Sequence, residues 1–144
     1  VPFVHMIHSV DSLRLLETIN REAEKLQRRV KVLLEVHIAK EVTKSGFTPE
    51  EFLSLNTKLS TLNHIDVCGV MGMATNTDDE DEWRRCFREI KHLGIQLLNH
   101  SDLLNNSAPQ ISMGMSDDYL VAIEEGSTMV RIGSTIFGNR DYKL

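Results

Sequence analysis

Apolar runs rich in β-branched residues alternate with helical patterns along this chain, and this alternation most limits the folds it can adopt. The expected strands cover residues 4–7, 30–38, 66–73, 111–113 and 128–132. Between them, apolar side chains recur every third or fourth position, as an amphipathic helix requires. Strands that alternate with helices favour a parallel sheet with right-handed crossovers. We therefore predict an α/β fold in which five parallel strands alternate with helices.

Local signals mark where the expected helices begin and end. Thr48 is followed by Pro49 and, three residues on, by Glu51, which is a strong helix start. Ser116 is a natural N-cap for a helix that Gly126 would end. Gly94 is expected to stop the helix over residues 81–93.

The stretch 111–138 holds two strand-to-loop turns separated by one short helix. The first turn contains Ser116 and the second contains Gly133 and Ser134. If the two strands are parallel neighbours, both turns open on the same side. Their backbone N–H groups and hydroxyls could then hold a phosphate, with Arg131 beside it. The alternative is that these residues only cap a helix and turn a corner.

Two segments of this stretch carry a family resemblance. SMGMSDD at 112–118, followed by the helix and VRIGSTIFG at 130–138, resembles the C-terminal signature of the pyridoxal-phosphate homeostasis protein family. That family is a single (β/α)8 TIM barrel related to the N-terminal domain of alanine racemase. It carries pyridoxal 5'-phosphate on a lysine of its first strand.

Further segments resemble strands four to six of the same barrel. These are HSVDS at 8–12, VLLEVHIAKEVTKSGF at 32–47 and CGVMGMA at 68–74. The resemblance implies that residues 1–144 are the C-terminal part of one barrel domain, a partial barrel of about five βα units. The segments expected before Val1, including the one with the cofactor lysine, would then lie outside this chain.

The resemblance also implies roles for individual residues. Phosphate sites of (β/α)8 proteins follow strands seven and eight, which places Ser116, Gly133 and Ser134 at the cofactor phosphate. In the related racemases the arginine that matches Arg131 contacts the pyridine nitrogen of the cofactor. The alternative role for Arg131 is a buried ion pair with a carboxylate. Met113 would form a wall beside the cofactor ring, although methionines at strand ends are mostly core residues.

Other features bear on partners and on location. The formal net charge is −5, from 16 basic and 21 acidic residues, and there is no basic run, which argues against a nucleic-acid surface. No apolar run has membrane-spanning length, and the histidines form no metal-ligand motif. Two cysteines fit a reducing compartment, so we expect a cytoplasmic protein. An open sheet leaves edges and an apolar face uncovered, which predicts either self-association or a chain that is part of a longer protein.

Lys44, with Ser45 and Gly46, also matches a loop motif of the family. It is expected to close over the site or to bind an anion; the alternative is a solvated loop lysine.

Three functions compete at this point. The first is pyridoxal phosphate binding for cofactor homeostasis, with no catalytic residue. The second is a pyridoxal-phosphate-dependent amino-acid racemase of the same fold, which needs a tyrosine from a further C-terminal domain. The third is a truncated scaffold that binds no cofactor. The resemblance favours the first for the intact protein.

Overall fold

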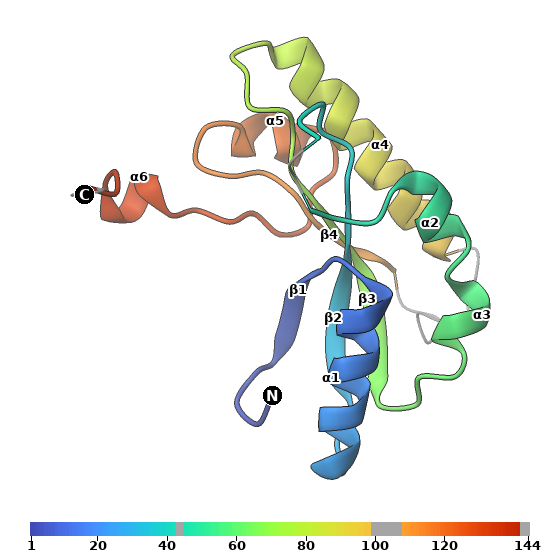
Figure 1. Cartoon of the computed structure of the whole chain (residues 1–144). Helices are drawn as coiled ribbons and strands as arrows, with labels where there is room; N and C mark the ends of the chain where they lie inside the picture. Colours follow the sequence, from blue (N-terminus) through green and yellow to red (C-terminus); the bar gives the residue numbers. More distant parts are fainter. Residues whose placement is uncertain (43–44, 99–107, 142–144) are drawn as a thin grey trace.

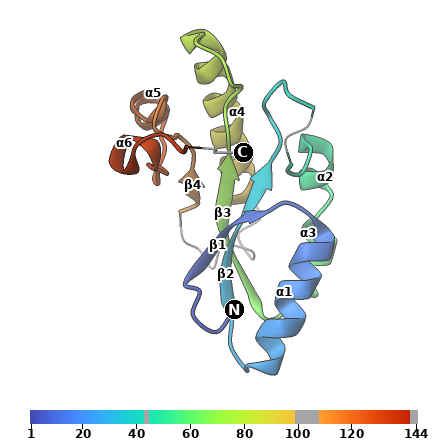
Figure 2. The same ribbon diagram turned by 60° about the vertical axis from the view of Figure 1, so that its left-hand side comes forward.

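Four parallel strands form one sheet in the order in which they occur along the chain. The computed structural model describes residues 1–42, 45–98 and 108–141. The sheet order is β1-β2-β3-β4, and every neighbouring pair is parallel. The strands are β1 (Met6–Val10), β2 (Val30–Val36), β3 (Ile65–Gly72) and β4 (Gln110–Ser112). The predicted α/β fold with a parallel sheet is confirmed, and Figure 2 shows the arrowheads of β2 and β3 pointing the same way.

Four of the described helices lie together on one side of this sheet (Figure 1). They are α1 (Leu13–Lys25), α2 (Pro49–Leu53), α3 (Asn56–Leu59) and α4 (Glu80–Leu98). Two short helices follow: α5 (Tyr119–Glu124), which contacts α4, and α6 (Ser134–Phe137), which extends away from the sheet. Thr48 caps α2 as expected, because its Oγ1 accepts from the N–H of Glu51 at 3.2 Å.

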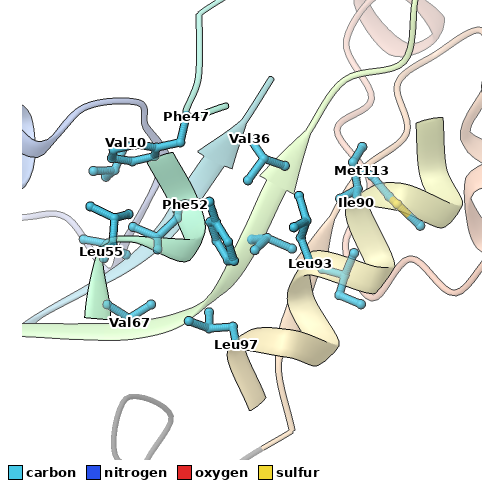
Figure 3. Close-up of a cluster of buried hydrophobic side chains, with 14 of the residues drawn as sticks. Val10, Val36, Phe47, Phe52, Leu55, Val67, Ile90, Leu93, Leu97 and Met113 are labelled. Carbon is cyan, nitrogen blue, oxygen red and sulfur yellow. The ribbon is translucent and has the colours of Figure 1, made fainter. Parts of the chain in front are cut away.

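The hydrophobic core fills the space between the sheet and these helices. Because side chains alternate along a strand, Val32, Leu34 and Val36 of β2 point to the helices and are buried. Figure 3 shows Ile90 and Leu93 of α4 packed within this cluster. Burying each such side chain contributes roughly 1.5–3 kcal/mol.

Gly94 does not end its helix, contrary to the sequence-based expectation. α4 continues through it to Leu98. A Cβ at position 94 would lie 3.1 Å from Cγ2 of Val70 and 3.5 Å from Cγ1 of Ile111. The glycine therefore lets the helix approach β3 and β4 closely, and this packing outweighs its low helix propensity.

The expected fifth strand over 128–132 is reduced to a single bridge. Met129 pairs in parallel with Ser112. Two backbone hydrogen bonds join the same two segments. The N–H of Met113 donates to the carbonyl of Met129 at 3.1 Å, and the N–H of Arg131 donates to the carbonyl of Gly114 at 2.9 Å. Gly114 has a φ of +99°, so the chain turns there and no longer offers a straight partner. The segment thus lies beside β4 without becoming a strand of the sheet.

Ser116 is not the N-cap of α5, which is a second correction. Asp118 occupies that position, and its Oδ1 accepts from the N–H of Met115 at 2.7 Å. An aspartate that bonds to the backbone three residues earlier forms a tight turn before the helix. Ser116 is thereby released for a different set of contacts.

Candidate functional site

The hydroxyl of Ser116 joins the two turns that the sequence analysis singled out. Its Oγ accepts from the backbone N–H groups of Gly133 and Thr135, both at 3.3 Å. The turn after β4 and the turn after the Met129 bridge therefore meet at one point. Two backbone donors that converge on one oxygen atom form the kind of concavity that binds an oxyanion.

Four of the predicted site residues line a single pocket of about 630 Å³. Ser116, Arg131, Gly133 and Ser134 contribute to its wall. The other lining residues are Met115, Asp117, Phe137, Gly138, Asn139 and Arg140. A Cβ at Gly133 would meet no atom within 4 Å, so the backbone there is open to an approaching ligand.

Arg131 is half-buried and bridges the carboxyl ends of β3 and β4. Its Nη1 donates to Oγ of Ser112 at 2.6 Å, and its Nη2 donates to the carbonyl of Gly72 at 3.1 Å. A hydroxyl and a carbonyl thus hold this guanidinium, rather than the carboxylate of the alternative reading. Burial lowers the pKa of Arg131, while the charges of Glu35 and Asp118 act in the opposite direction. An arginine remains a cation under all ordinary conditions.

Sequence reasoning missed three polar side chains on this face of the sheet. Oγ of Ser112 lies 3.0 Å from Nδ1 of His8 on β1. Glu35 of β2 is 3% exposed and accepts from the hydroxyl of Ser45 at 3.3 Å. Burial raises the pKa of Glu35, and the bond from Ser45 partly opposes that rise. The signal was available in the strand alternation, because Ser112 lies between the core residues Ile111 and Met113.

Met113 does not line the pocket, contrary to the prediction of a wall beside the ring. It is completely buried in the hydrophobic core, and Figure 3 shows it beside Ile90 of α4. It alternates with Ser112, so the strand that aims Ser112 at Arg131 aims Met113 at the helices.

The remaining expectations concern Lys44, metal sites and membrane-spanning helices. Lys44 lies outside the described residues. Within the described ranges, there is no group of three His, Cys, Asp or Glu side chains that could hold a metal ion. None of the helices in the described ranges combines the length and the apolar character needed to cross a membrane.

Comparison with known proteins places this chain in a family. The model of the family described as alanine racemase, N-terminal domain, matches residues 3–141. A pyridoxal phosphate homeostasis protein of Aquifex aeolicus is 37% identical over 139 residues, which are 96% of this chain and 60% of that protein. One from Helicobacter pylori is 40% identical over 133 residues, or 92% of this chain and 56% of that protein.

A solved structure with a similar fold is also a close match to this chain. PipY of Synechococcus elongatus, in a structure described as having pyridoxal phosphate bound, superposes with a TM-score of 0.84 at 30% identity. The match covers 96% of this chain and 63% of PipY. The chain therefore spans about three-fifths of the length of these relatives.

Proposed function

The chain belongs to the alanine racemase N-terminal domain family, and from this premise we propose that its protein binds pyridoxal 5'-phosphate and serves the homeostasis of that cofactor in the cytoplasm. The names of the relatives and the ligand of PipY support the proposal. The observation that carries it is the convergence of two backbone N–H groups on Ser116, beside Arg131.

The residues of the site fit the phosphate of this cofactor. A phosphate oxygen can take the place that Oγ of Ser116 now occupies as acceptor for the N–H groups of Gly133 and Thr135. The hydroxyl of Ser116, once released, is itself a donor, and so is the hydroxyl of Ser134. The open space around Gly133 admits the ligand to the backbone.

Arg131 suits the heterocycle of the same ligand. Pyridoxal phosphate, when bound, supplies an aldehyde and a ring that can withdraw electrons from an attached carbon. Arg131 cannot accept a proton from the ring nitrogen, and its positive charge disfavours protonation there. A ring held in this way is a weak electron sink, which suits holding the cofactor better than broad carbanion chemistry.

We further propose that residues 1–144 correspond to strands four to eight of a (β/α)8 barrel domain, with the Met129 segment in the place of the eighth strand. The coverage of 63% of PipY supports this, since five of eight units is about that share. On this proposal the lysine that carries the cofactor belongs to the first strand of the barrel, and the present residues supply the phosphate and ring contacts.

Binding is tested by equilibrium dialysis of the purified protein against pyridoxal 5'-phosphate, with pyridoxal and inorganic phosphate as competitors. Because the turns of Ser116 and Gly133 are proposed to bind the phosphate, pyridoxal 5'-phosphate should bind at least about tenfold more tightly than pyridoxal. Gly133→Asp places a carboxylate against the phosphate and should abolish that difference, whereas Arg14→Met on the exposed face of α1 should not change it. Equal binding of both forms would contradict the proposal.

We propose no turnover of a substrate by this protein. The test is racemisation of L-alanine by the protein saturated with cofactor, followed by chiral chromatography. The expected rate is that of the free cofactor. A rate at the level of an enzyme would instead assign the protein to the racemases.

A further inference from the structure

His8, Ser112 and Arg131 form a continuous chain of hydrogen bonds on the side of the sheet away from the helices. Oγ of Ser112 is 2.6 Å from Nη1 of Arg131 and 3.0 Å from Nδ1 of His8. Ser112 is completely buried. One hydroxyl therefore connects the guanidinium of the proposed ring contact to an imidazole of another strand.

Chemistry fixes the direction of the bond with Arg131, and the burial of Ser112 favours one direction for the bond with His8. A guanidinium only donates, so Oγ of Ser112 accepts from Arg131. The single hydrogen of the Ser112 hydroxyl is then directed to Nδ1 of His8. If Nδ1 of His8 carried a hydrogen instead, it would donate to the second lone pair of Oγ, and the buried hydroxyl hydrogen would lose this acceptor. We therefore assign the lone pair to Nδ1 and the hydrogen of the neutral ring to Nε2. A buried hydroxyl left without its acceptor would be costly.

We propose that His8 and Ser112 are positioning residues for Arg131, and that they fix its guanidinium only while the imidazole of His8 is neutral. The inference rests on the proposed function in taking Arg131 as the contact of the cofactor ring. A proton on Nδ1 of His8 would remove the acceptor of the Ser112 hydroxyl. It would also place a second cation next to the guanidinium.

The surroundings favour the neutral ring. Burial, and then the charge of Arg131, lower the pKa of His8 below its usual range. His5, Lys31 and Asp66 line the same pocket as His8, and Asp66 already pairs with Arg29. Glu35 acts on Arg131 from β2, and burial makes its own ionisation less favourable.

Because the orientation of Arg131 depends on the protonation of His8, retention of the cofactor depends on pH. At neutral pH the guanidinium is fixed, so no ordering cost arises when the ring binds. As His8 becomes protonated in acid, Arg131 loses its fixed orientation and the ring contact weakens. The protein would then hold the cofactor at neutral pH and release it more readily in acid.

The hydrogen-bond chain is tested without cofactor by long-range ¹H–¹⁵N NMR of the histidine rings, with His8 assigned from a His8→Gln variant. We expect the Nε2–H tautomer for His8 and a pKa below about 6.5. Ser112→Ala should abolish the preference for one tautomer, Ser112→Thr should restore it, and Ser9→Ala on the same strand should have no effect. A neutral His8 with its hydrogen on Nδ1, or an unchanged tautomer in Ser112→Ala, would overturn the proposal.

Binding measurements then test whether the hydrogen bonds of His8 and Ser112 affect the affinity for the cofactor. At about pH 8, Ser112→Ala should bind pyridoxal 5'-phosphate about tenfold more weakly than the unaltered protein. As the pH falls from about 8 through the pKa of His8 that the NMR titration gives, the ratio should fall towards one, because His8 becomes charged in both proteins. A ratio that stays constant over this range would contradict the positioning role. Failure of the unaltered protein to bind the cofactor would contradict the proposed function instead, and the NMR result would still decide the role of His8.

Discussion

Nδ1 of His8 lies 3.0 Å from Oγ of Ser112, although the two residues belong to the two outer strands of the sheet. Strands β1 and β4 are three strand spacings apart, which is about 14 Å in a flat sheet. The contact therefore requires a strongly curved sheet, whose concave side carries His8, Ser112 and Arg131. A curved parallel sheet with helices on its convex side is the arrangement of a (β/α)8 barrel wall.

A double-mutant cycle in urea unfolding measures this contact across the sheet. His8→Leu and Ser112→Ala should show a coupling energy of about 1 kcal/mol, because each variant removes one partner of a single hydrogen bond. Ser9→Ala combined with His8→Leu provides the matched pair for which we expect strict additivity. Additivity of the first pair would mean that the outer strands do not meet.

We predict that Gly69→Ala strongly destabilises the protein. A Cβ at position 69 would overlap the carbonyl oxygen of Gln110 on β4, and Gly69 has a φ of +156°. Neither the backbone of β4 nor that conformation accommodates a side chain, so we expect a loss of at least about 3 kcal/mol. Gly133→Ala, whose Cβ would meet nothing within 4 Å, should unfold at the same urea concentration as the unaltered protein. Equal midpoints for both variants would show that β3 and β4 are not in contact at Gly69.

Glu82 should make stability depend on pH in the acid range. Its carboxylate accepts from both Thr75 and Arg85, each at 2.7 Å. These bonds, that from Arg85 foremost, lower the pKa of Glu82 to about 2, compared with 4.5 for the unperturbed group. A carboxylate with a lowered pKa stabilises the fold above the pKa of the unfolded state, and this contribution is lost as the pH falls from 4.5 towards 2.

Urea midpoints measured from neutral pH down to pH 3 test this expectation. Glu82→Gln should cost about 1–2 kcal/mol at neutral pH and show a flatter decline in acid than the unaltered protein. Glu24→Gln, at an exposed position of α1, should behave like the unaltered protein. Parallel curves for Glu82→Gln and the unaltered protein would refute the role of this carboxylate.

Self-association stays a prediction, and the structure points to where it would occur. Ile136 and Phe137 of α6 are 66% and 85% exposed, and adjacent exposed apolar side chains favour contact between proteins. Sedimentation velocity at increasing concentration should show oligomers, and replacing both residues with serine should shift them towards monomer. A monomer at all concentrations for the unaltered chain would contradict this prediction.

Local patterns in the sequence predicted the parts of the fold that depend on local physics. The parallel strands follow from apolar runs such as β2, and the start of α2 follows from Thr48 and Pro49. Gly94 was misread because its role depends on how closely a helix packs on Val70, far away in sequence. Ser116 was misread because Asp118, only two residues later, makes the competing turn.

The sequence predicted only those parts of the candidate site whose residues lie close together in the sequence. The turns of Ser116 and Gly133 meet as expected, and Arg131 faces the sheet rather than the helices. The bond between His8 and Ser112 joins residues 104 positions apart, and no pattern in the sequence indicates such a pair. Met113 was predicted beside the cofactor ring because of its place at a strand end, although its alternation with Ser112 places it on the core side with Ile111.

The most direct measurement of the central claim is a backbone amide NMR titration with pyridoxal 5'-phosphate. The two turns predict that the amide signals of Gly133 and Thr135 move most, with Ser116 and Arg131 moving with them, and that Gly133→Asp abolishes these changes. A second pocket, lined by His5, Lys31 and Cys68 among others, provides the contrasting result. If the signals around that pocket shift instead, while Gly133 and Thr135 stay in place, the phosphate does not bind where the two turns meet.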